Sequence, residues 1–119
     1  MQKTILIYDD DLEILTVCKA ILGLENYHVE TLANCENIIS DIKKIQPAII
    51  LMDLWIPKDG GEEAVRLMHE NEETNHIPVI LFSANDEIEI ISKRINANGY
   101  LKKPFNISEF RKMIESNIL

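Results

Sequence analysis

Acidic residues directly follow two apolar segments of the sequence, and this arrangement favours a cation site. Residues 9–11 are all Asp and follow the apolar segment 4–8, and Asp53 follows the apolar segment 48–52. Carboxylates held a few ångströms apart repel one another, increasingly so away from bulk water, unless a cation joins them. Mg²⁺ is a hard cation that proteins hold with one or two carboxylates, water and phosphate oxygens. The pattern therefore indicates a magnesium site.

A hydroxyl and an ammonium group follow two further short segments of strand length. Ser83 follows the segment 79–82, and Lys103 follows the segment 100–102. Taken alone, a Ser at such a place begins a turn, and a Lys is solvated at the surface. The coincidence of these groups with the acids, all at the ends of segments of strand length, favours a shared site.

The acids also have an ordinary structural explanation, which differs between them. An Asp after a strand commonly caps the following helix, and this is the role expected of Asp11. The pair Asp9 and Asp10, taken alone, fits a helix cap as well as a site. No other metal site is indicated, because the three His residues lie far apart in the sequence and neither Cys has a partner at ligand spacing. The histidines are His28, His69 and His76, and the cysteines are Cys18 and Cys35.

The elements that must position these groups alternate between short apolar runs and longer segments of helical period. The expected strands are 4–8, 28–32, 48–52, 79–82 and 100–102. The expected helices are 11–22 ended by Gly23, 36–45 stopped by Pro47, 62–72, 86–95, and one opened by a capping-box pattern at Asn106 and Glu109. Residues 57–61 are an expected loop. This alternation predicts an α/β fold of the doubly wound (βα)5 type, with a five-stranded parallel sheet.

The character of the strands also predicts their order. The segments 4–8, 48–52 and 79–82 are apolar throughout, as central parallel strands are. The segment 28–32 alternates and the segment 100–102 is short and lysine-rich, as edge strands often are. With right-handed crossovers these features fit the order 2-1-3-4-5, the flavodoxin-like arrangement. Ligands of such sheets bind at the carboxyl ends of the strands where the winding reverses.

Composition limits the classes of protein that remain. The chain has 119 residues, 46% hydrophobic and 27% charged residues, and a net charge of −8, which suits one folded domain over 1–119. The acidic balance argues against nucleic-acid binding, no apolar run is long enough for a membrane helix, and the N-terminus does not resemble a signal peptide. The isolated cysteines fit a reducing compartment, so a cytoplasmic location is expected.

These residues together resemble the receiver domain of bacterial two-component response regulators, the CheY-like family. The resemblance rests on five elements in order, from ILIYDDD through ILMDLWIPKDGG and VILFSA to GYLKKPF, and it covers nearly the whole chain. The motif positions are Asp9-Asp10, Asp53 with Pro57 and Gly60, Ser83-Ala84, and Lys103-Pro104-Phe105.

The resemblance implies a phosphoacceptor signalling domain. Asp53 would accept a phosphoryl group from a histidine kinase or histidine phosphotransferase, in a reaction that needs Mg²⁺. Asp10 and Asp53 would ligate Mg²⁺ directly, with the backbone carbonyl of Trp55, while Asp9 would act largely through water. Lys103 would pair with a phosphoryl oxygen. The chain would assist its own phosphorylation and dephosphorylation without being an enzyme that turns over a substrate.

The resemblance also implies a switch. Ser83 would hydrogen-bond the phosphoryl group, Tyr100 would move with that hydroxyl, and the peptide bond before Pro104 would be cis. The negative charge that phosphorylation adds can shift a two-state element, here the fourth helix, the fifth strand and the fifth helix. That face would meet an unknown output partner or form a dimer.

Two departures from the family pattern affect these expectations. Trp55 is unusually bulky for its place. Its indole either shields the acyl phosphate from water, or it points away and only the backbone carbonyl of Trp55 takes part in the site. The stretch of 20 positions between Ser83 and Lys103 is shorter than usual, so the fourth-helix surface is expected to differ from that of most receivers.

Partner surfaces are expected near the site. In the first helix, a core stripe of Ile14, Val17, Cys18 and Ile21 leaves Leu15 off the stripe, near the rim. The resemblance implies that this end of the helix meets the helical bundle of the kinase, which makes Leu15 and Phe105 candidate docking residues. The alternative is that Leu15 is an ordinary exposed residue without a partner. Ile88, Ile90, Ile91 and Ile95 exceed one narrow stripe, so some of them can face a partner. Residues 93–119 hold 6 basic and 2 acidic side chains, which suggests a basic face.

Other functions remain to be weighed. A receiver that docks without phosphorylation would have lost some of the site residues, all of which are present here. A dehalogenase-type phosphatase needs a second acid two positions after its nucleophile, where this chain has Trp55. The sequence names neither the kinase nor the output, and a stand-alone regulator is slightly favoured over a piece of a longer protein.

Overall fold

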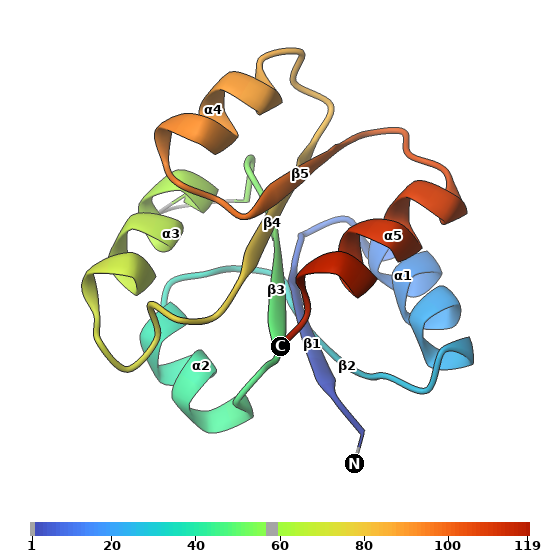
Figure 1. The fold of residues 1–119 in the computed structure, drawn as a ribbon, viewed down its shortest axis with the longest axis horizontal. Helices are drawn as coiled ribbons and strands as arrows, with labels where there is room; N and C mark the ends of the chain where they lie inside the picture. Colours follow the sequence, from blue (N-terminus) through green and yellow to red (C-terminus); the bar gives the residue numbers. More distant parts are fainter. Residues whose placement is uncertain (1, 57–59) are drawn as a thin grey trace.

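The computed structural model describes residues 2–56 and 60–119, and it contains a parallel sheet covered on both faces by helices (Figure 1). The strands are β1 (Thr4–Tyr8), β2 (His28–Leu32), β3 (Ile49–Asp53), β4 (Val79–Ser83) and β5 (Gly99–Lys102). The helices are α1 (Leu12–Leu24), α2 (Ile38–Ile45), α3 (Gly60–Glu70), α4 (Ile88–Arg94) and α5 (Ile107–Asn117). Of the expected loop at 57–61, residues 57–59 lie outside the described part, and residues 60 and 61 belong to α3, which begins two residues earlier than expected.

The sheet has the order β2-β1-β3-β4-β5 with every neighbouring pair parallel, which confirms the predicted fold. Helices α1 and α5 cover one face of the sheet, while α2, α3 and α4 cover the other (Figure 1). Because successive side chains of a strand point to opposite faces, each strand contributes to both cores. Ile5, Ile7 and Leu51 belong to the core under α1 and α5, whereas Leu6 and Met52 belong to the opposite core.

Local hydrogen bonds move three helix starts and ends from their expected places. The side chain of Asn34 accepts the amide of Glu36, and that of Asn85 accepts the amide of Glu87. Such turns compete with helix formation, so α2 and α4 begin two residues later than expected. Gly23 does not end α1: the helix continues to Leu24, and Asn26, at φ 64°, takes the left-handed conformation that closes it.

The expected core stripe of α1 is wrong for Val17, and the expectation that Leu15 lies off the core is also wrong. Leu15, Cys18 and Leu22 are the buried residues of α1, and Val17 is 56% exposed. The apolar residues of this helix fit two stripes of the same period, and the sequence pattern cannot show which stripe faces the sheet.

None of the described helices is long and apolar enough to cross a membrane.

Candidate functional site

The alternation of side chains along the strands sorts the predicted site residues onto two faces of the sheet. Asp9 follows Ile7 by two positions and Asp53 follows Leu51 by two, so both carboxylates lie on the face covered by α1 and α5. Tyr100 packs against the opposite core, beneath α2, α3 and α4. The site therefore lies at the carboxyl edge of the sheet, with charged groups on one side and the expected switch on the other.

Three acids meet at this edge as the sequence predicts. One carboxylate oxygen from each of Asp9, Asp10 and Asp53 lies within 4.8 Å of the other two. Asp9 is fully buried and Asp53 is 5% exposed, whereas Asp10 is exposed. Asp11 stands apart from this group, because its side chain accepts the amides of residues 13 and 14 and so caps α1 as expected.

The side chain of Lys103, the first residue after β5, reaches into the acidic group. Its ammonium lies 3.0 Å from Oδ2 of Asp9 and 3.8 Å from Oδ1 of Asp53, and the Lys103 side chain is 18% exposed. Its backbone amide donates to the carbonyl of Ser83 at 2.8 Å, which ties the loop after β5 to the end of β4. The Lys103–Pro104 peptide bond is cis, in agreement with the expectation.

The environment of Asp53 raises the pKa of its carboxyl group when no cation other than Lys103 is near. The pKa of Asp53 is raised from 3.8 to about 6, chiefly by burial and next by the negative charge of Asp9. The ammonium of Lys103 and the amide of Trp55 act the other way, because both stabilise the carboxylate. A divalent cation at this cluster would also stabilise the carboxylate and so lower the pKa of Asp53.

Close packing of α3 against Asp53 depends on one glycine. A Cβ atom placed on Gly61 would lie 2.5 Å from the backbone oxygen of Asp53, closer than side chains approach. The amide of Gly61 also donates to the carbonyl of Leu54 at 3.3 Å. Gly60, at φ 72°, takes the left-handed conformation at the start of α3.

The two residues expected to form a switch do not contact each other through a hydrogen bond in the described structure. The hydroxyl oxygen of Ser83, which is buried, accepts the amide of Asn85 at 3.1 Å. Tyr100 is partly exposed, and its hydroxyl donates to Glu89 of α4 at 3.0 Å. That contact raises the pKa of Tyr100, because the phenolate would face a carboxylate.

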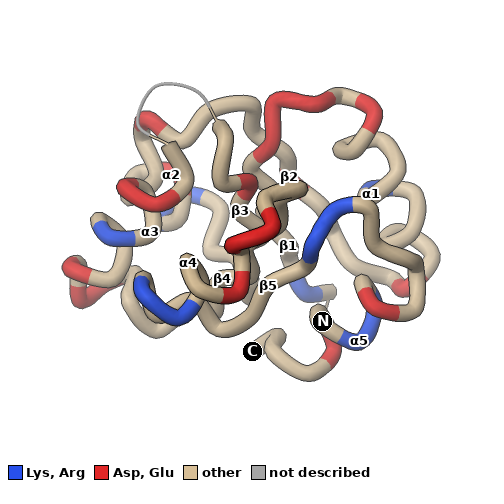
Figure 2. Tube along the Cα trace, turned by 90° about the horizontal axis from the view of Figure 1, so that it is seen from above, with Lys and Arg blue, Asp and Glu red and all other residues tan. Residues whose placement is uncertain are grey.

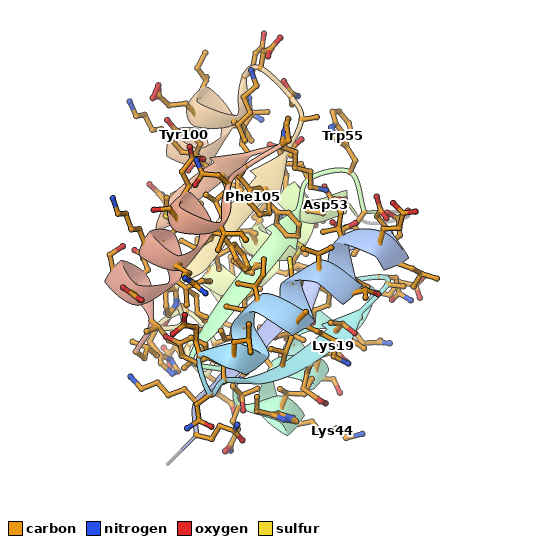
Figure 3. The ribbon with its side chains drawn as sticks, turned by 90° about the vertical axis from the view of Figure 1, so that its right-hand side faces the viewer. Lys19, Lys44, Asp53, Trp55, Tyr100 and Phe105 are labelled. Carbon is orange, nitrogen blue, oxygen red and sulfur yellow. The ribbon has the colours of Figure 1, made fainter. Side chains whose placement is uncertain are left out.

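Trp55 borders the site with its backbone, and its indole points outward. Its amide donates to Oδ1 of Asp53 at 3.3 Å, and its neighbours Leu54 and Ile56 are buried. The Trp55 side chain is 69% exposed, and Figure 3 shows its ring directed away from Asp53. Of the two explanations for its bulk, the structure favours the one in which the indole does not cover the carboxylate.

The candidate docking residues fare differently. Leu15 is 7% exposed and packs in the core, so its proposed docking role is wrong. Phe105 is partly buried, and it borders an apolar groove between α1 and the loop after β5, with Ile14, Val17 and Pro104. Figure 3 shows Phe105 on the same edge of the molecule as Asp53.

The expected isoleucine surplus and basic face are only partly present. In α4, Ile88 and Ile91 are buried and Ile90 is 65% exposed. Basic residues of the C-terminal third alternate with acids of neighbouring elements (Figure 2). Besides Lys103, ion pairs are formed by Arg94 with Glu62, Lys102 with Asp86, and Arg111 with Glu25.

Two residues near the site were missed from the sequence. The ring of Phe82 lies under the ammonium of Lys103, and Glu89 holds the hydroxyl of Tyr100. The alternation along β4 could have placed Phe82 on the face of the carboxylates. No signal in the sequence pairs Glu89 with Tyr100.

Comparison with known proteins agrees with this geometry. Residues 5–115 match the response regulator receiver domain family. The transcriptional regulatory protein KdpE of Staphylococcus aureus is 37% identical over 96% of this chain and 49% of its own length. The sporulation initiation phosphotransferase F of Bacillus subtilis is 31% identical over 97% of this chain and 93% of its own length. Against several such curated relatives, the chain spans about half their length.

Solved structures give the same result for the fold. A putative response regulator from Chloroflexus aurantiacus superposes with a TM-score of 0.91 at 24% identity, covering 98% of this chain and 97% of that one. The receiver domain of a sensor histidine kinase from Pseudomonas aeruginosa, described with a magnesium ion coordinated in its active site cleft, superposes with a TM-score of 0.88 at 25% identity. It covers 98% of each chain. The chain therefore belongs to the response regulator receiver domain family of two-component systems.

Proposed function

We propose that Asp53 is the phosphoacceptor of this chain and that it takes a phosphoryl group from a phosphohistidine in the presence of Mg²⁺. The observation that carries the proposal is the convergence of Asp9, Asp10 and Asp53 within 4.8 Å, with the ammonium of Lys103 against two of them. Family membership supports the same chemistry. The phosphoryl donor would be a histidine kinase or a histidine phosphotransferase.

In the proposed reaction a carboxylate oxygen of Asp53 attacks the phosphorus atom. A new P–O bond forms as the P–N bond to the donor histidine breaks, and the electron pair of that bond returns to the imidazole nitrogen. An aspartate is a weak nucleophile, so alignment and charge neutralisation must supply most of the catalysis. Lys103 is placed to neutralise charge on the phosphoryl oxygens, and Asp9 orients its ammonium.

The donor set fits Mg²⁺ as the accompanying cation. Asp9, Asp10 and Asp53 offer hard carboxylate oxygens close together, and the exposed Asp10 opens the group to solvent. When bound, the ion would supply positive charge that offsets the phosphoryl oxygens. The backbone carbonyl of Trp55 would be a further ligand of Mg²⁺.

The proposed switch uses the other face of the sheet. A phosphoryl group on Asp53 would draw the hydroxyl of Ser83 away from the amide of Asn85, which it now accepts. Tyr100 would then leave Glu89 and follow that hydroxyl inward. Movement of these groups would alter the face formed by α4, β5 and α5, where an output partner or a second copy would bind.

The phosphodonor protein would approach the edge where the exposed Asp10 opens the acidic group to solvent. The apolar groove beside Phe105 lies on this edge and suits a helix of that donor. We propose that the chain stores the phosphoryl group as a signal and is not a phosphatase that turns over phosphoesters. A dehalogenase-type phosphatase needs a second acid two positions after its nucleophile. In this chain that position holds Trp55, whose side chain is exposed.

Phosphorylation by a small donor tests the proposal without knowledge of the kinase. With Mg²⁺ and phosphoramidate the protein should gain the mass of one phosphoryl group, and it should gain none with excess EDTA. Asp53→Asn should abolish the gain. The matched control Asp86→Asn removes an exposed acid outside the cluster and should leave it unchanged. No gain by the native protein, or an equal gain by Asp53→Asn, would contradict the proposal.

A further inference from the structure

Phe82 contributes a contact that the family motifs of the sequence do not include. The ammonium of Lys103 lies 4.7 Å from the centroid of the Phe82 ring. Phe82 is 2% exposed, so water is largely excluded from the ring. A cation at this distance from an aromatic face is attracted by the negative charge of the π system, most strongly where both groups are desolvated.

The sheet register explains how the ring reaches this place. Phe82 is the partner of Asp53 across β3 and β4, and of Leu101 across β4 and β5. Side chains paired in this way lie on the same face of the sheet. Lys103 follows Leu101 by two positions, so the ring lies between the strand that carries the phosphoacceptor and the strand that leads to the lysine.

We propose that Phe82 is a positioning residue, which holds the ammonium of Lys103 at the phosphoryl site through this cation–π contact. The inference rests on the proposed function, because the value of a fixed ammonium is the neutralisation of phosphoryl charge. The carboxylates of Asp9 and Asp53 hold Lys103 now, but both also belong to the proposed Mg²⁺ ligand group. The aromatic ring is not a ligand for Mg²⁺, so its hold on Lys103 does not depend on whether a metal is bound.

The packing around Phe82 fixes both the ring and the loop that carries the lysine. Phe105 contacts Phe82 edge to face, with ring centroids 6.5 Å apart and planes at 74°. Phe105 also stacks on Phe110 of α5 at 5.3 Å. Because Phe105 is only two residues after Lys103, one aromatic cluster holds the backbone of the loop and the ammonium at its start.

Stepwise fluorination of the ring separates this role from simple core filling. Phe82 is replaced site-specifically by 4-fluoro-, 3,5-difluoro- and 3,4,5-trifluorophenylalanine, which withdraw charge from the ring face and change its volume little. The rate of phosphorylation by phosphoramidate at fixed Mg²⁺ should fall with each fluorine, by about three- to tenfold for the trifluoro ring. The same series at Phe110, which is in the cluster but not under the ammonium, should change the rate less than about twofold.

A second measurement needs neither metal nor phosphodonor. The ε-methylene protons of Lys103 should resonate upfield in the NMR spectrum of the metal-free protein, because of the ring current of Phe82. Phe82→Leu should remove this shift, and Phe110→Leu should preserve it. A rate that does not depend on fluorination at Phe82, an equal effect at Phe110, or an unchanged Lys103 resonance in Phe82→Leu would overturn the proposal. If the native protein is not phosphorylated, the proposed function is wrong, and the resonance alone decides whether the contact exists.

Discussion

The ammonium of Lys103 lies 3.0 Å from the carboxylate of Asp9, although 94 positions separate the two residues in the chain. The contact joins the first strand of the fold to the loop after the last one, across the carboxyl edge of the sheet. It also gives a fully buried carboxylate the positive partner that burial requires. The same ammonium is 3.8 Å from Oδ1 of Asp53, so Lys103 forms ion pairs with both carboxylates.

Removal of this lysine should destabilise the metal-free protein. Lys103→Met leaves Asp9 and Asp53 buried without a cation, and we expect a loss of about 1–3 kcal/mol in the free energy of unfolding at pH 7. Urea denaturation measures it. The control Lys102→Met breaks an exposed pair with Asp86 and should cost about 0–1 kcal/mol. Mg²⁺ should stabilise Lys103→Met more than the native protein. Equal losses in the two variants would contradict this prediction.

The stability of the metal-free protein should depend on pH through Asp53. Its pKa is about 6 in the folded protein and ordinarily 3.8, so the folded state binds the proton more tightly than the unfolded state. The stabilisation is fully present below pH 3.8 and is lost as the pH rises through about 6. Asp53→Asn should therefore gain stability over the native protein across this range, reaching about 1–3 kcal/mol at pH 7.

Urea denaturation in EDTA between pH 4 and 7.5 measures that difference. Asp86→Asn is the control, and its pH dependence should have the opposite sign. Lys102 lowers the pKa of Asp86, so the stabilisation that the Asp86 carboxylate contributes is lost as the pH falls. A difference between the native protein and Asp53→Asn that stays constant with pH would show that burial does not perturb Asp53.

Two glycines near helix ends should respond in opposite ways to alanine. Gly61→Ala would place a methyl group 2.5 Å from the backbone oxygen of Asp53, so we expect a loss of about 1–3 kcal/mol and weaker Mg²⁺ binding. Gly23→Ala lies within α1 with nothing inside 4 Å of the new atom, so a gain of about 0.5–1 kcal/mol is expected. Thermal melts and Mg²⁺ titrations test both. A tolerated Gly61→Ala would mean that α3 does not press on Asp53.

Truncations in α1 test which stripe of this helix is buried. Leu15→Ala removes a core side chain and should cost about 2–4 kcal/mol. Val17→Ala removes an exposed one that borders the groove beside Phe105, and should cost less than about 1 kcal/mol. Chemical denaturation compares them. The reverse order would restore Leu15 as a surface residue.

Trp55 provides a spectroscopic probe of the site. It is the sole tryptophan, and its exposed indole should be quenched readily by acrylamide. Because its amide donates to Asp53, Mg²⁺ binding should change its emission intensity in the native protein but not in Asp53→Asn. Identical Mg²⁺ responses in the two proteins would place the ion elsewhere.

The sequence predicts the fold well because the fold depends on patterns within single segments. The wholly apolar runs at 48–52 and 79–82 indicate buried parallel strands, and the order 2-1-3-4-5 follows from them. Helix ends were less predictable, since single side-chain bonds from Asn34 and Asn85 decide where α2 and α4 begin. The acids and Lys103 were predictable as a group because parallel strands bring their carboxyl ends to one edge.

Other features depend on contacts between segments and were decided only by the tertiary structure. The rotation of α1, which buries Leu15 and exposes Val17, depends on how the helix packs on the sheet, since its apolar residues fit either stripe. The ring of Phe82 under Lys103, and Glu89 against Tyr100, each join residues from different elements. The sequence by itself determined which chemical groups gather at the edge of the sheet, because strand ends and alternation are local. Their distances, burial and partners followed only from the packing of distant segments against one another.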